Sequence, residues 1–171
     1  MEEIYLFDSP TLKKLEKIKQ KYSNLNTMDV LLYLEIHKSY KLMKDKYDSL
    51  LQVYNLTEAK FSIMMLLTYE NDMILAPSEL AEKLGSKKST ITGIIKGMEK
   101  RNLIVRKELP NDKRANYVQL TNEGSELLKR FLPFNYDLVS KVFEVFNEEE
   151  KKQFYMLSNK LKNHLEKDEV L

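Results

Sequence analysis

Residues 78–121 constrain the fold of this chain more than any other segment, because they place two short helical patterns around a single glycine. Ser78–Leu84 carries apolar residues at helical spacing. Gly85 interrupts that pattern, and Ser86 is expected to cap a second helix over Lys87–Arg101. Two short helices joined by a glycine turn predict a helix-turn-helix.

A β-hairpin is predicted directly after this pair of helices. Asn102 tolerates the left-handed backbone conformation that ends many helices. Leu103–Glu108 and Tyr117–Leu120 read as two strands, and the sequence Pro-Asn-Asp at 110–112 is typical of a turn between them. A hairpin in this position is the wing of a winged helix-turn-helix.

The helix predicted over Lys87–Arg101 has two chemically different faces. Its apolar face is formed by Ile91, Ile94, Ile95 and Met98. The opposite face presents small and basic residues, namely Ser89, Thr92, Gly93, Lys96 and Lys100. A close approach of another surface would explain Gly93, and tight packing inside the domain would explain Gly97, since glycine costs about 1 kcal/mol relative to alanine in a helix.

Such a face fits the major groove of DNA. Hydroxyl groups bond base edges or phosphates, and lysines neutralise phosphates. The free N–H groups at the helix start, near Ser86, Lys87 and Lys88, also favour a phosphate. Ordinary amphipathic surface helices show the same stripe and lysines, so a role without DNA stays open at this point.

Charge is distributed unevenly along the chain. The whole sequence has a net charge of +2, but residues 76–120 hold ten Lys and Arg residues against five Asp and Glu residues. A basic middle between mildly acidic ends is typical of a nucleic-acid-binding module, although a solvated basic surface gives the same count.

The wing offers further candidates. Arg114, next to Lys113 near the hairpin tip, is expected to enter the minor groove. Asp112 is poorly suited to contact phosphate, so its expected role is internal, holding the shape of the wing through Arg114 or turn N–H groups. A surface salt bridge worth under about 1 kcal/mol is the simpler alternative for Asp112 and Arg114.

Helices are predicted on both sides of this module. Ser9 and Pro10 look like the cap and first residue of a helix, and Pro133 is expected to kink or divide a helix that Thr121 caps. The apolar stripes of residues 12–22, 31–54 and 154–165 are candidates for a dimer interface, or for packing within one chain.

Other classes of protein are not favoured. The chain lacks Cys and has two His residues, which argues against disulfides, metal sites and cofactors. No nucleophile elbow, P-loop or dinucleotide fingerprint occurs, so no enzyme is expected. The apolar runs are too short to span a membrane and no secretory signal is evident, so a cytoplasmic protein is expected.

Three blocks of sequence together resemble the MarR family of bacterial transcriptional regulators. They are SELAEKLG at 78–85, STITGIIKGMEKRNLI at 89–104, and DKRANYVQLT at 112–121 followed by Asn-Glu-Gly. The resemblance implies a mainly helical α+β winged helix whose flanking helices form a dimerisation bundle. It also implies a homodimer on pseudo-palindromic double-stranded DNA, usually a repressor and often released by a small-molecule effector.

From this resemblance, the chain is expected to form one compact domain with three parts. Residues 1–56 and 122–171 are expected to dimerise, and residues 57–121 to form the DNA-binding lobe. The candidate DNA contacts are Ser86, Lys87, Lys88, Ser89, Thr90, Thr92, Gly93, Lys96, Lys113 and Arg114.

The effector cleft implied by the resemblance has three candidate lining residues, Tyr33, Tyr40 and Phe61. Many relatives carry arginine where this chain has Gly93, so the base contact made by that arginine does not carry over. Relatives also commonly have glycine where this chain has Asn102. Two alternatives remain: a winged-helix interaction module without DNA binding, and a general architectural DNA binder.

Overall fold

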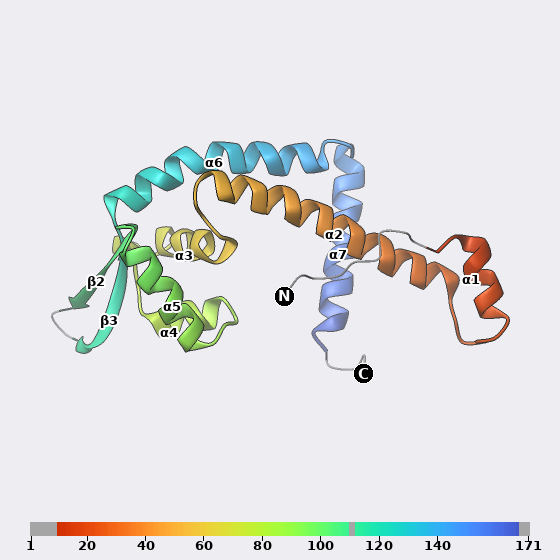
Figure 1. Ribbon diagram of the computed structural model, residues 1–171, viewed down its shortest axis with the longest axis horizontal. Coiled ribbons are helices and arrows are strands. Elements are labelled where there is room, and N and C mark those ends of the chain that lie inside the picture. The colour runs from red at the N-terminus through yellow and green to blue at the C-terminus, as the bar shows by residue number, and fades with distance from the viewer. Residues whose placement is uncertain (1–9, 110–111, 168–171) are drawn as a thin grey trace. The chain divides into compact units, whose positions relative to one another are not determined.

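The computed structural model describes residues 10–109 and 112–167, without the side chains of residue 109 and residues 112–116 (Figure 1). The chain divides into two units, residues 1–57 and 58–171.

The first unit contains helices α1 (Leu12–Lys19) and α2 (Thr27–Val53), which pack against each other. Leu15 is the buried residue of α1. The helix is capped by Thr11, whose hydroxyl accepts from the Lys14 N–H, so the expected cap at Ser9, which lies outside the described residues, was wrong. A cap one residue before Leu12 leaves Pro10 outside the helix. Asn26 caps α2 through the Met28 N–H.

The second unit carries the helix-turn-helix, the hairpin and two further helices. Its elements are α3 (Glu58–Thr68), a 3₁₀ turn η1 (Asn71–Met73), β1 (Ile74–Leu75), α4 (Pro77–Lys83), α5 (Lys88–Glu99), β2 (Ile104–Leu109), β3 (Asp112–Leu120), α6 (Asn122–Phe143) and α7 (Glu148–Leu165). This mainly helical winged-helix architecture confirms the predicted fold class.

The hairpin belongs to a three-stranded antiparallel sheet in the order β1-β3-β2. Ile104 pairs with Leu120 in the hairpin, and Ile74 of β1 pairs with Gln119 on the other side of β3. The Gln119 side chain adds a bond by donating to the Asp72 carbonyl oxygen at 2.9 Å. The very short strand β1 thereby ties the end of α3 to the base of the wing.

One apolar core joins the helices of this unit to its sheet. Large side chains with under 2% of their surface exposed come from α3, α4, α5, β2, β3 and α6; they are Ile63, Met64, Leu67, Leu80, Ile91, Ile95, Met98, Ile104, Val118 and Phe131. Burying a side chain of this size contributes about 1.5–3 kcal/mol, so this core is what holds α5 and the hairpin in place.

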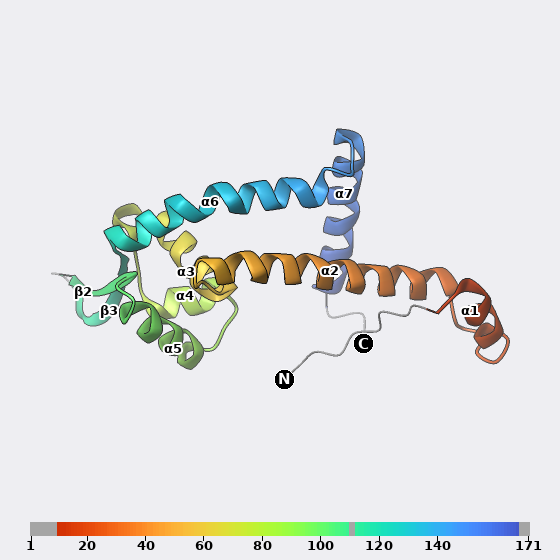
Figure 2. The same ribbon diagram turned by 45° about the horizontal axis from the view of Figure 1, so that its top comes forward.

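Helix α6 runs without interruption from the wing to α7 (Figure 2). Pro133 was expected to kink or divide this helix; it lies inside the helix and does not divide it. Proline removes one backbone hydrogen bond, but the same helix buries Leu127, Leu128 and Phe131, and that burial outweighs the loss.

Helix α7 begins at the predicted capping box, but its apolar residues are not packed into the core. Asn147 accepts from the N–H groups of Glu149 and Glu150, and the Glu150 carboxylate accepts from the Asn147 N–H, which completes a capping box. No residue of α7 is buried. None of the helices in the described part of the chain has the length and apolar character needed to cross a bilayer.

Candidate nucleic-acid interface

The start of α5 is set by the way α4 ends. Gly85 has a φ of +57°, and its N–H donates to the Glu82 carbonyl while the Ser86 N–H donates to that of Ala81. These two bonds form a Schellman motif, which ends a helix with a glycine in the left-handed region. Ser86 is therefore part of the closure of α4. Lys87 occupies the N-cap position of α5, so the prediction that Ser86 caps this helix was wrong.

The same closure ends α5. Asn102 has a φ of +54°, its N–H donates to the Glu99 carbonyl, and the Leu103 N–H donates to that of Met98. The predicted left-handed conformation of Asn102 is confirmed. Helix α5 is thus held between two sharp turns, and its register relative to the core is well defined.

The two faces of α5 are separated as the periodicity predicts. Ile91, Ile95 and Met98 are at most 1% exposed. The solvent-exposed residues of its first turns and outer face are Lys87, Lys88, Ser89, Thr90, Thr92, Gly93, Lys96 and Lys100, while Ser86 is half-buried. A continuous surface of hydroxyls, lysines and one glycine therefore lies on the side of α5 that faces away from the core.

The lysines on this surface are not neutralised by neighbours. Within the described part of the chain, Lys87, Lys88, Lys96 and Lys100 form no ion pair. Other cations of the basic segment do: Arg106 Nε lies 2.9 Å from Glu99 Oε1, and Lys83 Nζ lies 3.3 Å from Glu70 Oε1. The four lysines of the outer face of α5 therefore keep their charge available to another molecule.

Thr92 differs from the other hydroxyl residues of this surface. Its Oγ1 donates to the Lys88 carbonyl oxygen at 2.8 Å, one turn earlier in the helix. The hydroxyl keeps its acceptor capacity toward an external donor. In this rotamer, Thr92 is suited to accept from a base amino group rather than to donate to a phosphate.

The two glycines of α5 are both uncrowded. A Cβ built on Gly93 or Gly97 would have no neighbouring atom within 4 Å. The expectation that Gly97 allows tight packing inside the domain is therefore wrong. Gly93 is exposed at the centre of the outer face, where its missing side chain leaves space for another molecule.

An ion pair links the wing to α5 at its base. The Arg106–Glu99 ion pair links β2 to the end of α5. Asp112, Lys113 and Arg114 belong to β3, but their side chains lie outside what the structure describes, as do residues 110–111 of the predicted turn. Their contacts with DNA and with each other stay predictions.

A second junction joins the wing to α6. The Thr121 hydroxyl donates to the Asn102 carbonyl at 2.6 Å and accepts from the Gly124 N–H at 3.0 Å, which confirms Thr121 as the cap of α6. A Cβ on Gly124 would overlap the carbonyl oxygen of Leu103. The first turn of α6 thus packs directly on the backbone that follows α5.

The three expected effector residues lie in different units. Tyr33 and Tyr40 are exposed on α2, where the Tyr33 ring lies 4.3 Å from that of His37. Phe61 on α3 packs edge-on against Phe131 at 5.0 Å and lines a cavity of about 380 Å³ together with residues of α6.

One residue of that cavity was missed by the sequence analysis. Asn135 is 7% exposed, lines the cavity, and its buried Oδ1 has no hydrogen-bond partner. It follows Leu128 and Phe131 on the buried stripe of α6. A polar residue on an apolar stripe is the signal that marks it.

Comparison with known proteins agrees with this geometry. Residues 56–115 match the MarR family. The HTH-type transcriptional repressor YetL of Bacillus subtilis (strain 168) is 32% identical over 145 residues, which cover 85% of this chain and 87% of YetL. The chain belongs to the MarR family.

Two solved structures show the same fold. One is Sco3205, a MarR family transcriptional regulator from Streptomyces coelicolor, in complex with DNA: the TM-score is 0.74 and the identity 24%, over 85% of this chain and 92% of the other. The other is the organohalide-sensing regulator RdhR-CbdbA1625 bound to 2,4-dichlorophenol, with a TM-score of 0.70, 20% identity and coverage of 95% and 89%.

Membership in the MarR family determines the class of this protein. It is a DNA-binding transcriptional regulator and not an enzyme, as the sequence predicts.

Proposed function

We propose that this MarR-family regulator is a homodimeric repressor that binds a pseudo-palindromic operator and is released by a small-molecule effector. The observation that supports it most directly is the outer face of α5, where four unpaired lysines surround exposed hydroxyls. The repressor assignment is supported by the name of YetL. The protein acts in the bacterial cytoplasm, where its DNA lies.

In this proposal α5 enters the major groove. Ser89 and Thr90 face base edges or phosphates, and Thr92 accepts from a base amino group. Lys88 and Lys96 neutralise phosphates. Ser86 and Lys87 lie where the free N–H groups of the helix start favour a phosphate. The lack of a side chain at Gly93 lets the helix approach the base pairs closely.

The wing is proposed to contact DNA beside the groove that α5 enters. Lys113 and Arg114 are proposed to contact the neighbouring minor groove, where a narrow A·T-rich segment concentrates negative potential. Asp112 is proposed to hold the wing in shape. Arg114→Ala is then expected to weaken specific binding directly, and Asp112→Ala indirectly.

A second copy is proposed to cover α7. This helix has 18 residues and buries none of them, while Phe154, Leu157, Leu161 and Leu165 lie on one side and are 44–66% exposed. An isolated helix of that length is marginal in water, so it needs a partner for its apolar stripe. A two-fold axis would also space the two α5 helices by about 34 Å, one turn of DNA.

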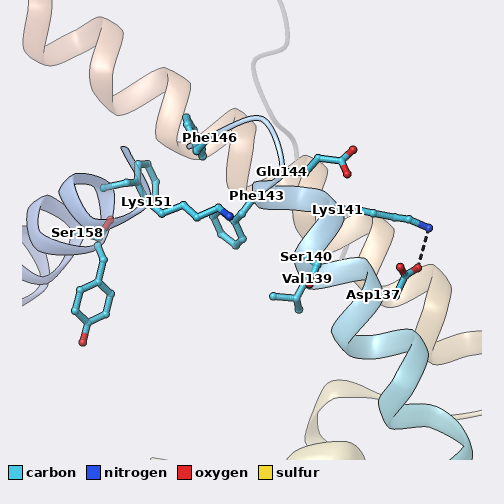
Figure 3. Close-up of a pocket in the computed structure, with 11 residues that line it drawn as sticks. Asp137, Val139, Ser140, Lys141, Phe143, Glu144, Phe146, Lys151 and Ser158 are labelled. Carbon is cyan, nitrogen blue, oxygen red and sulfur yellow. Dashed lines mark ion pairs between the residues drawn. The ribbon is translucent and has the colours of Figure 1, made fainter. Parts of the chain in front are cut away.

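The apolar surface continues from α7 onto α6. Phe143, Phe146 and Phe154 form an aromatic cluster, with the Phe146 and Phe154 rings stacked at 5.7 Å. They line an open cavity of about 720 Å³ between the two helices (Figure 3). At its edge, Lys141 Nζ lies 2.8 Å from Asp137 Oδ2, and this hydrogen bond to the carboxylate raises the pKa of Lys141. An apolar cavity with a charged rim is typical of a protein interface.

Effector release is the third part of the proposal. Phe61, which lines a cavity of the second unit, is proposed to line an effector site. Tyr33 and Tyr40 stay separate candidates on α2 of the first unit. The RdhR-CbdbA1625 structure holds 2,4-dichlorophenol, which supports a small aromatic effector. An effector would shift binding by having a different affinity for the DNA-binding and non-binding arrangements of the two α5 helices.

The experiment that tests this function selects bound fragments from the source genome. The best fragment and a scrambled control are then titrated at two salt concentrations. A pseudo-palindromic site preferred by a factor of about 10³ or more supports a specific regulator. Equal, salt-sensitive binding to both would mean an architectural protein, and no binding would mean an interaction module.

Lys96→Ala tests the face of α5 in the same titration. We expect weaker binding and a salt slope reduced by about 1, because one phosphate contact is lost. Lys13→Ala, on the exposed side of α1, is the matched control and should change neither quantity. An unchanged slope for Lys96→Ala would contradict the proposed orientation of α5.

A further inference from the structure

We infer that α5 reads an A·T base pair through two neighbouring residues, Thr92 and Gly93. The Thr92 hydroxyl accepts from the adenine amino group, and the space beside Gly93 takes the methyl group of the paired thymine. This inference rests on the proposed entry of α5 into the major groove and goes beyond it by naming the base pair. It uses only residues of the second unit.

The Thr92 hydroxyl faces outward as an acceptor. Its Oγ1 donates its own hydrogen to the Lys88 carbonyl oxygen at 2.8 Å, and this bond selects one of the two side-chain rotamers that threonine adopts in a helix. The residue is exposed, so the lone pairs of the oxygen remain available to another molecule. The hydrogen-bond donors of the major groove are the amino groups of adenine and cytosine. Thr92 alone therefore narrows the choice to these two bases.

The helix surface next to Thr92 is hollow. A Cβ on Gly93 would meet no atom within 4 Å, and the same holds for Gly97, one turn later. Ser89, one turn earlier, is exposed and carries a small side chain. Residues four apart are neighbours on a helix surface, so the backbone of α5 is open to close approach from Ser89 to Gly97. Helices α3 and α4 pack on the opposite, buried side of α5 (Figure 2).

A thymine methyl group fits this hollow. Glycine destabilises a helix interior relative to alanine, and no contact within the described part of the protein explains its presence at residue 93. The apolar group that the major groove presents is the 5-methyl group of thymine. An A·T pair offers an amino group and a methyl group at the same groove edge, whereas a C·G pair offers an amino group without a methyl group. Gly93 thus resolves the choice that Thr92 leaves open.

Replacing thymine by uracil tests the methyl contact, because uracil lacks only the methyl group and keeps every hydrogen bond of the base pair. The thymines of one operator half-site are replaced one by one, and each duplex is titrated by fluorescence anisotropy. We expect one thymine at which the wild type loses affinity about fourfold, the factor for one buried methyl group. If no thymine of the half-site responds to the replacement, the inference is overturned.

Gly93→Ala is expected to invert the preference at that thymine. The alanine methyl group and the thymine methyl group compete for the same space, so this variant should bind the uracil duplex more tightly than the thymine duplex. Gly97→Ala makes the same change on the same helix and is the matched control, which should keep the fourfold preference for thymine. Both variants are expected to fold, because alanine favours a helix. Retention of the thymine preference in Gly93→Ala, or its inversion in Gly97→Ala, would refute the role of Gly93.

Thr92→Val tests the acceptor, because valine keeps the shape of threonine and lacks the hydroxyl. The adenine paired with the sensitive thymine is replaced by purine, which has no amino group. We expect the wild type to lose affinity about fivefold, the factor for one neutral hydrogen bond, and Thr92→Val to bind both duplexes equally. Both proteins are measured on the same two duplexes, so any change in the duplex itself cancels. If Thr92→Val still prefers adenine, another residue accepts from the amino group.

These results separate the base readout from the proposed function. If the wild type prefers its operator over scrambled DNA and no thymine responds to uracil, the specific regulator stands and the base readout fails. If the wild type binds operator and scrambled DNA equally, the proposed function fails and the base readout fails with it. A thymine preference that Gly93→Ala inverts, together with an adenine preference that Thr92→Val loses, supports both.

Discussion

At the scale of single residues, the two glycines of α5 offer the cleanest separation of stability from function. Both lie in a helix interior, and a Cβ on either would meet no atom of the protein. Only Gly93 is fully exposed at the centre of the face that we assign to DNA, whereas Gly97 is half-buried nearer the helix end. Comparing the same substitution at both positions therefore separates its effect on the stability of the helix from its effect on a molecule bound to the outer face of α5.

We expect Gly93→Ala and Gly97→Ala each to raise the free energy of unfolding by up to about 1 kcal/mol, because alanine loses less backbone entropy in a helix. Gly93→Ala should also weaken operator binding, since its methyl group blocks the approach of the helix to the bases. Urea denaturation and a DNA titration of both variants measure these effects. Full DNA affinity in Gly93→Ala would mean that no surface comes close to this position.

Residue-level prediction succeeded where the determinant is local. Thr121 and Asn147 cap their helices with their own side chains, and Asn102 tolerates the left-handed conformation. Ser86 shows the limit: serine is a good cap, but its backbone is used by the closure of α4. Whether a residue between two helices closes the first helix or caps the second depends on the geometry of both helices. The residue type alone does not decide between these two roles.

At the scale of elements, the junction between the wing and α6 depends on one glycine. The Thr121 N–H donates to the Leu103 carbonyl at 3.1 Å, and Gly124 packs against the same carbonyl. Any side chain at residue 124 would push the first turn of α6 away from the backbone that follows α5. This contact holds the start of α6 against the backbone between α5 and the wing.

Gly124→Ala is expected to lower the free energy of unfolding by about 1–3 kcal/mol, because the methyl group overlaps backbone that cannot move aside easily. Chemical denaturation measures the loss. Ser125→Ala, the adjacent residue in α6, is the control and should stay within about 0.5 kcal/mol of the wild type. An unchanged free energy of unfolding in Gly124→Ala would show that the junction is looser than its geometry indicates.

Elements were predicted well where the pattern is long. The helix-turn-helix, the hairpin and α7 follow from periodicity and turn residues. Strand β1 was missed because a strand of two residues is too short to show an alternating pattern of apolar and polar residues. Its partner β3 also lies more than 40 residues further along the chain. For Pro133 the local chemistry predicts a kink or a division, and the helix is not divided because burial of the neighbouring apolar residues outweighs the lost hydrogen bond.

At the scale of the whole molecule, assembly is the main prediction. Leu157→Glu places a charge in the apolar stripe of α7, and we expect it to convert a dimer into a monomer by sedimentation analysis. Binding to a full pseudo-palindromic site should fall more than tenfold, while binding to a half-site should change little, because only the linkage of the two modules is lost.

Asn163→Glu tests charge alone, since residue 163 is exposed on the opposite side of the same helix. This variant should remain a dimer with unchanged operator affinity. If Leu157→Glu also stayed dimeric, α7 would not be the surface that joins two copies. If the wild type were monomeric, α7 would be covered by another part of its own chain.

The sequence by itself determined the winged-helix class, the two faces of α5, the concentration of basic charge and the family. Each of these follows from spacing, composition or short motifs, which are local properties of the chain. Only the tertiary structure decided which cations are paired, that Gly97 meets nothing, and that Asn135 lines a cavity without a hydrogen-bond partner. These facts depend on groups distant in sequence that folding brings together, and no local pattern records which neighbours a side chain will meet.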